Sequence, residues 1–306
     1  MEETDTDYQK VSKITGKFLN LVRLNPQSLL NVVENMTGCQ PILLDYPIKP
    51  IPRYGHGKPS HPELYEIINR NRNAYKKTLL SFLKFKEYFL KIPVKNASAA
   101  QEPCWNNGWL PGLDSVTLYS LLCISNPKRF IEIGSGNSTK FAKRAILDHH
   151  LRTKIVSIDP YPRAHIDLMC DTVIRQPLED VDLSLFDKLE AGDVLYVDGS
   201  HRCFTNSDVT VVFLDVLPRL RSGIFVELHD IELPDDYCRE YAQRYYSEQY
   251  LLAVYILAQS NKFNIVLPNS FVSDDVELSN ILSPLWEEPM MRDVERHGGS
   301  FWIQTR

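Results

Sequence analysis

Arg129-Phe-Ile-Glu-Ile-Gly-Ser-Gly-Asn-Ser-Thr139 is the stretch that decides the fold. It begins with a short run of β-branched and aromatic residues, which is typical of a buried strand. The glycines that follow allow a tight turn and let a ligand approach the backbone. Residues 138–149 then predict a helix that Ser138 or Thr139 would cap. We therefore predict a strand, a glycine turn and a helix, with a ligand site at the turn.

The same alternation of strands and helices continues toward the C-terminus. Alternating elements of this kind favour a parallel sheet with helices on both faces. The fold class that we predict is α/β, a doubly wound, mostly parallel seven-stranded Rossmann-like sheet. Its last two strands have no strong helix pattern between them and predict an antiparallel edge pair. After the first strand, the predicted strands are 154–159, 171–175, 193–198, 223–229, 263–267 and 300–304, and the later predicted helices are 183–189, 207–217 and 241–259.

The first hundred residues differ from the rest of the chain. They predict a helical N-terminal appendage over 1–100, followed by the main domain over 101–306. Helical spacing is found over 8–35 and 61–91, and a proline-rich loop over 46–62 separates the two, because each proline fixes φ and removes a donor. The second helical segment is expected to pack on the main domain. A lid or a dimerisation element, and so a homodimer, is the alternative.

Composition narrows the class of partner. The chain of 306 residues has a net charge of -5, whereas proteins that neutralise many phosphates carry a basic surplus. We expect no nucleic-acid partner and, from the shortness of the apolar runs, no membrane partner. The acidic N-terminus does not read as a secretory signal. Six scattered cysteines without a CxxC pair indicate a reducing cytoplasm.

Polar residues follow the carboxyl end of several predicted strands. They are Glu132 to Gly136, Asp159, Asp198 and the pair His229-Asp230. Open α/β sheets bind ligands beyond the carboxyl ends of their strands. The sequence therefore predicts one acid-lined crevice.

The glycine turn discriminates between ligand classes. A dinucleotide-binding loop would have a third glycine where Thr139 stands. Glu132 also suits a cationic ligand better than a diphosphate. Asp159, which ends the next strand, is placed to accept both hydroxyls of a ribose. A ligand that carries a ribose and a positive charge is the best match.

Four sequence segments carry a resemblance to a known family. Glu132-Ile-Gly-Ser-Gly-Asn-Ser138, Ser157-Ile-Asp159, Val197-Asp-Gly-Ser-His201 and Leu228-His-Asp-Ile231 resemble class I S-adenosylmethionine (SAM)-dependent methyltransferases. The last two look like the subgroup with small-molecule and sugar O-methyltransferases. The resemblance covers residues 105–305 and implies SAM as the cofactor and a small-molecule acceptor.

The resemblance also implies roles for individual residues. Glu132, Gly134 and Gly136 would lie against the methionine part of SAM, and Asp159 would hold the ribose. Leu178 or Glu179 would meet the adenine, and Asp198 would face the sulfonium or the acceptor. The remaining loop residues expected at the cofactor are Ser135, Asn137 and Ser138.

Two kinds of acceptor chemistry stay open. Some relatives hold a divalent metal such as Mg²⁺ at the positions of Asp198, His229 and Asp230, although most have two acids in place of His229-Asp230. Magnesium prefers oxygen ligands, so the histidine departs from that pattern. Alternatively, His229 or His201 acts as the general base beside Asp198, because imidazole titrates near neutral pH.

The sequence also leaves three other functions open. The competing functions are a nicotinamide-dependent oxidoreductase, a nucleic-acid base methyltransferase and a non-catalytic SAM-binding module. The second would have a Pro-Pro-aromatic motif where Asp198-Gly-Ser-His201 stands. The segment Trp105-Asn-Asn-Gly-Trp109 either lines the pocket or anchors the appendage. Glu248 and Gln249 are placed to reach the cleft.

Overall fold

The computed structural model describes residues 26–42, 44–95, 97, 99–258 and 261–306. The chain forms two units, Met1–Lys49 and Pro50–Arg306. In the first unit, helix α2 spans Pro26–Thr37, and most of the side chains from residue 30 to 49 are exposed. Much of the helix predicted over 8–35 lies outside the described residues.

The boundary between the units differs from the predicted one near residue 100. Helices α3 (Pro62–Asn69), α4 (Arg72–Phe82) and α5 (Lys86–Phe89) belong to the second unit, with the 3-10 turn η1 (Leu83–Phe85) between the last two. Their apolar faces pack in the core that the sheet also forms. The helices therefore pack on the main domain, as predicted for 61–91, because their apolar stripes need that cover.

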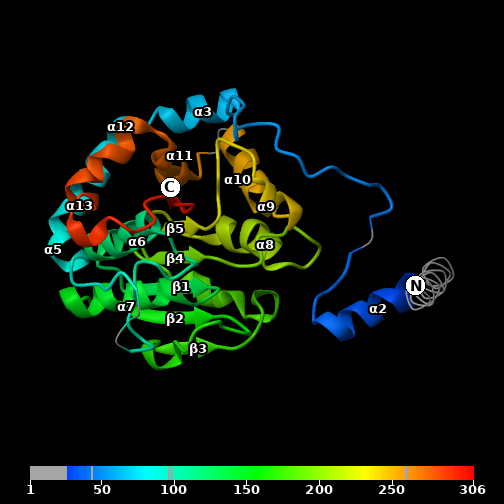
Figure 1. The fold of residues 1–306 in the computed structure, drawn as a ribbon. Coiled ribbons are helices and arrows are strands. Elements are labelled where there is room, and N and C mark those ends of the chain that lie inside the picture. The colour runs from blue at the N-terminus through cyan, green and yellow to red at the C-terminus, as the bar shows by residue number, and fades with distance from the viewer. Residues whose placement is uncertain (1–25, 43, 96, 98, 259–260) are drawn as a thin grey trace, which may run out of the picture. The chain divides into compact units, whose positions relative to one another are not determined.

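The sheet has seven strands in the order β3-β2-β1-β4-β5-β7-β6. All neighbouring pairs are parallel except β5·β7 and β6·β7, which are antiparallel. Figure 1 shows β3, β2, β1, β4 and β5 one beside the next. The predicted α/β fold class is confirmed. The strands are β1 (Arg129–Ile133), β2 (Lys154–Ile158), β3 (Thr172–Ile174), β4 (Val194–Val197), β5 (Phe225–Leu228), β6 (Phe263–Pro268) and β7 (Phe301–Thr305).

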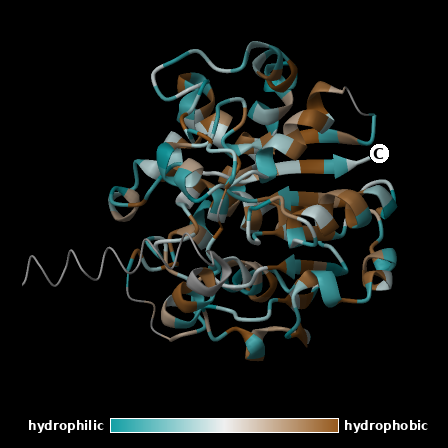
Figure 2. Cartoon of the chain, turned by 90° about the vertical axis from the view of Figure 1, so that its right-hand side faces the viewer, coloured by the Kyte–Doolittle hydropathy of each residue, from teal (hydrophilic) through white to brown (hydrophobic). Residues whose placement is uncertain are grey.

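The last two strands form the predicted antiparallel pair at one edge of the sheet. Within this pair β7 lies next to β5 and β6 is the outermost strand, whereas β3 is the opposite edge of the sheet. β7 is buried at four of its five residues, as expected of a strand with a neighbour on each side. Figure 2 shows hydrophobic residues along the strands and hydrophilic ones on many outer helices and loops.

The helices that flank the sheet depart from prediction in two places. The predicted helix 241–259 is broken into α9 (Arg239–Gln243) and α10 (Glu248–Leu257), and Tyr245 between them has a left-handed φ of 57°. Between β6 and β7, three short helices occur where no strong pattern is present: α11 (Asn269–Asp274), α12 (Val276–Ser279) and α13 (Ser283–Trp286). The longer helices beside the first strand are α6 (Gly112–Ser125) and α7 (Asn137–His149).

Short helical turns complete the elements. The segment predicted as a helix over 207–217 starts as α8 (Asp208–Val211) and continues as a π-helical turn. The turns are η2 (Asp167–Met169), η3 (Leu178–Asp180), η4 (Leu183–Lys188), η5 (Val212–Val216), η6 (Leu217–Arg219), η7 (Asn280–Leu282) and η8 (Pro289–Met291). In the described part of the chain, no helix has the length and apolar character needed to cross a membrane. The six cysteines are free thiols.

The proline-rich segment 50–61 packs on the loop that follows β5. The Asp236 carboxylate accepts from the backbone N–H groups of Arg53 and Tyr54 at 2.6 and 3.2 Å. The backbone N–H of His61 donates to the carbonyl of Pro234 at 3.1 Å. The loop beyond the carboxyl end of β5 is therefore held by a segment distant in the sequence.

Candidate functional site

The turn after β1 lies directly against the end of β4. Gly134 has a φ of +79°, and a Cβ atom there would lie 1.8 Å from the carbonyl oxygen of Asp198. Only glycine combines this backbone conformation with so close an approach. The turn therefore brings two predicted site segments together, the cofactor loop and the Asp198 strand end.

Glu132 is buried below this turn. One carboxylate oxygen, Oε2, accepts a hydrogen bond from the Thr139 hydroxyl, and the other, Oε1, has no partner. Burial raises the pKa of Glu132 to about 7, although the nearby hydroxyls of Ser138 and Thr139 oppose the rise. An unpaired buried acceptor of this kind is costly unless a ligand donor satisfies it.

Gly136 leaves open space in the same turn. No protein atom lies within 4 Å of the point where its Cβ would be. Its backbone N–H donates to the Thr139 hydroxyl at 3.1 Å, so the same threonine links Gly136 and Glu132. The turn thus combines an unpaired carboxylate oxygen of Glu132 with open space at Gly136, two features that suit a ligand with an ammonium group.

Asp159 is joined to the cofactor loop by direct bonds. Its Oδ2 accepts from the backbone N–H of Ser135 at 2.9 Å, and its Oδ1 accepts from the N–H of Tyr161 at 2.8 Å. The hydroxyls of Ser135 and Ser157 lie 2.7 Å apart. A carboxylate has about four lone-pair sites, so each Asp159 oxygen keeps capacity for a ligand hydroxyl.

The other predicted cofactor residues lie around this core of the site. The Asn137 side-chain amide donates to Asn107 Oδ1 at 3.1 Å, and Ser138 is buried in the first turn of α7. After β3, Leu178 is buried in the hydrophobic core, while Glu179 is half-buried. Of these two, only Glu179 has a partly accessible side chain.

The upstream tryptophans take different roles. Trp105 is buried and packs on the rings of Phe89 and Phe141. These contacts fit the second of its two predicted roles, an anchor for its loop. Trp109 is 63% exposed, and the guanidinium of Arg163 lies 4.5 Å from its ring centroid.

Beyond β4 and β5, two histidines and four acids form one group. We call this group, which comprises Asp198, His201, Glu227, His229, Asp230 and Glu248, the histidine–carboxylate cluster. His201 Nε2 lies 3.2 Å from Asp198 Oδ1 and 3.5 Å from Asp230 Oδ2. His201 Nδ1 lies 3.0 Å from Glu248 Oε2. Both ring nitrogens thus face carboxylates, which requires both to be donors.

His229 belongs to a second pair in the cluster. Its Nδ1 lies 2.9 Å from Glu227 Oε1 and 3.2 Å from the Tyr196 hydroxyl. Its Nε2 is 4.0 Å from Asp230 Oδ1. The side chain is 3% exposed, against 37% for Asp198, so Asp198 is the accessible member of the three predicted catalytic residues.

The charges in the cluster favour protonated histidines. Burial lowers the pKa of His201, but hydrogen bonds to Asp198 and Glu248 outweigh burial and raise it well above its ordinary value. The pKa of His229 is raised in the same way, because attraction to Asp198 and Glu227 outweighs burial. Burial would raise the pKa of Asp198, yet attraction to His229 and the His201 hydrogen bond lower it.

These contacts bear on two expectations about the acceptor side. Both ring nitrogens of His201 face carboxylates, so neither is left open to take a proton from an acceptor. The predicted metal ligands Asp198, His229 and Asp230 are not arranged around a common point: among the described residues, no group of three His, Cys, Asp or Glu side chains is placed to hold a metal ion. The His201 ring instead contacts both aspartates, and the His229 ring is turned to Glu227.

Sequence reasoning missed part of the cluster. Glu227 lies within β5 and shares a face with His229 two residues later, a spacing that could have been noticed. Glu248 was expected near the cleft, but its bond to His201 was not predictable from spacing. Tyr241 donates its hydroxyl to Asp230 Oδ1 at 3.0 Å, and its ring stacks on Tyr246 at 4.9 Å.

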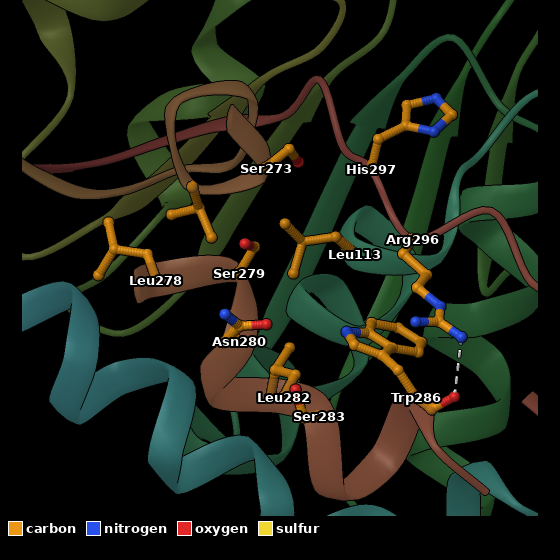
Figure 3. A pocket seen from close by; sticks show the side chains of 11 residues that line it. Leu113, Ser273, Leu278, Ser279, Asn280, Leu282, Ser283, Trp286, Arg296 and His297 are labelled. Atoms are coloured by element: carbon orange, nitrogen blue, oxygen red, sulfur yellow. Dashed lines mark hydrogen bonds between the residues drawn. The ribbon is translucent and has the colours of Figure 1, made fainter. Parts of the chain in front are cut away.

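A separate cavity of about 210 Å³ lies between the start of α6 and helices α11–α13. Figure 3 shows its side chains, with Arg296 bonded to the backbone carbonyl of Trp286. None of the predicted site residues lines it.

Comparison with known proteins finds a family match over part of the chain. Residues 131–231 match the family described as a methyltransferase domain. An uncharacterised protein of Archaeoglobus fulgidus is 35% identical over 94 residues, which are 28% of this chain and 41% of that protein. The chain thus spans less than half of that relative's length.

Solved structures give a weaker likeness. An O-methyltransferase from Bacillus cereus in complex with S-adenosylhomocysteine (SAH) is 16% identical with a TM-score of 0.38, over 75% of this chain and 90% of that one. An SAH-bound methyltransferase from Podospora anserina is 13% identical with a TM-score of 0.39, over 79% of this chain and 96% of that one.

Proposed function

We propose that the protein is a class I SAM-dependent methyltransferase that transfers a methyl group from SAM to a hydroxyl of a small-molecule acceptor. The methyltransferase-domain match over residues 131–231 and the order of strands in the sheet support this proposal. The observation that carries the proposal is the unpaired Oε1 of buried Glu132, in a turn where Gly136 leaves open space. This acceptor and space suit the ammonium of an amino-acid moiety, and SAM has one.

The residues of the loop divide the binding of the cofactor among them. Glu132 would hold the amino group, and Asp159 would accept the ribose hydroxyls with its remaining lone pairs. Glu179 is the better of the two candidates for the adenine, because Leu178 is committed to the core. When bound, SAM supplies an electrophilic methyl group on a sulfonium.

Asp198 is the residue that we propose for the acceptor. Its backbone lies against Gly134, and its carboxylate is more exposed than either histidine of the cluster. A carboxylate there would orient the acceptor hydroxyl for an in-line displacement and accept its proton as the new bond forms. His201 and His229 would hold Asp198 ionised through their positive charge.

The cluster also predicts which acceptors are excluded. Its acids outnumber its histidines, so an acceptor that brings phosphate or several carboxylates close to Asp198 would meet repulsion. We infer a neutral or cationic acceptor. Six free thiols support a reducing compartment such as the cytoplasm as the place of action.

Calorimetry with SAH is the direct test of the cofactor. We expect micromolar or tighter binding to the full chain, and at least about tenfold weaker binding after Asp159→Ala, because charge-assisted hydrogen bonds to a ligand would be lost. If the folded protein does not bind SAH, the proposal is wrong. Turnover is then sought with SAM and a panel of neutral phenols, monosaccharides and aliphatic alcohols, with SAH release as the readout.

A further inference from the structure

Glu248 is the buried residue whose position the proposed chemistry leaves unexplained. It is the first residue of α10 and has no exposed surface. Its Oε2 bonds His201 Nδ1 at 3.0 Å, whereas its Oε1 has no partner. A buried carboxylate with a free oxygen is poor evidence for a gain in stability. Another reason for its presence is therefore needed.

The turn that begins α10 fixes the backbone of His201 as well as its ring. The carbonyl oxygen of His201 accepts from the N–H groups of Ser247 and Glu248 at 2.8 and 3.2 Å. His201 itself has a left-handed φ of 60°. The ring of Tyr246 lies 4.6 Å from the imidazole, centroid to centroid. One short segment, 246–248, thus holds the carbonyl, one ring nitrogen and one ring face of His201.

This arrangement leaves a single free direction for His201. With Nδ1 bonded to Glu248, the Nε2–H group is the donor that reaches Asp198 at 3.2 Å. A carboxylate that bonds one nitrogen of a histidine sets which nitrogen carries the functional contact. We propose that Glu248 is a positioning residue that aims His201 at Asp198 during methyl transfer. The proposal rests on the proposed function.

Three variants separate positioning from stability. Glu248→Leu removes the bond to His201, and we expect kcat to fall about 100-fold, within the usual range for a lost acid–base contribution. Glu248→Gln keeps an acceptor oxygen at the same place without the charge, so a fall of about tenfold is expected. Tyr255→Phe is the control. Tyr255 lies on the same helix as Glu248, and the substitution deletes its hydrogen bond to the Phe213 carbonyl, away from His201.

The measurements use a neutral acceptor found in the turnover panel. The dissociation constant of SAH should stay within about twofold in all three variants, because none of the residues touches the cofactor loop. Positioning by Glu248 is wrong if Glu248→Leu folds and keeps its kcat, or if Tyr255→Phe lowers kcat equally.

A spectroscopic readout needs no acceptor. In protein with ¹⁵N-labelled histidine, both ring nitrogens of His201 should give the signals of protonated imidazole at pH 7, and Glu248→Gln should shift the Nδ1 signal. An unchanged Nδ1 signal would overturn the positioning role, even if Glu248→Leu fails to fold. Loss of SAH binding by the wild-type chain would instead overturn the proposed function, so the two failures are distinguishable.

Discussion

The cofactor loop and the histidine–carboxylate cluster lie at neighbouring strand ends but are built differently. The loop is seven consecutive residues, 132–138, whose backbone makes the contacts, with Gly134 against Asp198 and Ser135 bonded to Asp159. The cluster gathers side chains from β5, from the ends of β4 and β5 and from the start of α10. The first should therefore fail through changes in backbone shape, and the second through loss of single charges.

The largest expected effect is on the loop backbone. Gly134→Ala places a Cβ 1.8 Å from the Asp198 carbonyl oxygen at a φ of +79°. We expect the free energy of unfolding to fall by about 3 kcal/mol, since strain and a clash combine. Chemical denaturation followed by fluorescence measures it.

Gly136→Ala is the matched control for this change. Its Cβ would meet no protein atom, and its φ of -178° is open to any residue. We expect a change in unfolding free energy within about 0.5 kcal/mol. SAH binding should nevertheless weaken, because the methyl group enters the open space in this turn. If Gly134→Ala and Gly136→Ala destabilise the protein equally, the backbone conformation of Gly134 is not what makes the loop sensitive.

The next effect concerns the charge of Glu132. Since burial raises its pKa from 4.5 to about 7, the folded protein retains a proton there that the unfolded chain has lost. The unfolding free energy of the ligand-free protein should therefore fall between pH 4.5 and 7 on this account and level off above pH 7. SAH binding should tighten over the upper part of this range, because the ligand ammonium needs the ionised carboxylate.

Glu132→Gln tests both statements. We expect SAH to bind about 10- to 100-fold more weakly at pH 8, as a charged hydrogen bond is lost. The part of the pH dependence near pH 7 should disappear from calorimetric titrations. If the variant binds SAH with the wild-type affinity and pH profile, the unpaired oxygen has another partner.

The smallest effect of these substitutions on unfolding and SAH binding together is expected at Tyr241, which contacts the cluster through Asp230. Tyr241→Phe removes one hydrogen bond to Asp230, which should cost about 1 kcal/mol of unfolding free energy. SAH affinity should not change, because Tyr241 does not contact the loop. A loss of SAH binding here as large as in Glu132→Gln would erase the distinction between the two regions.

The sequence could predict features that are built from consecutive residues, but not those that depend on contacts between distant segments. The strands and the glycine turn are local patterns of apolar and glycine residues, so their existence and most of their bounds were correct. The place of β7 between β5 and β6 depends on tertiary packing, and no local pattern reports it. The break between α9 and α10 is likewise set by the turn at Tyr245, which lacks a glycine or proline signal.

For the site, too, the sequence predicted the local features but not the tertiary contacts. Glu132, Asp159 and Asp198 follow from their place at strand ends, where parallel topology gathers them. The roles of His201 and His229 did not follow, because their protonation depends on Glu248 and Glu227, and only coordinates show these pairings. Residue type alone left the general-base and metal-ligand roles open.

The contacts of Asp236 have a consequence for motion of the loop that follows β5. Its carboxylate binds the amides of Arg53 and Tyr54, and its own N–H donates to the Tyr54 carbonyl at 3.3 Å. Opening of the loop after β5 must therefore release segment 50–61 at the same moment, or stretch these bonds. In hydrogen exchange, the amides of Arg53, Tyr54 and Asp236 should exchange as one cooperative unit, although the chain between them contains most of the sheet.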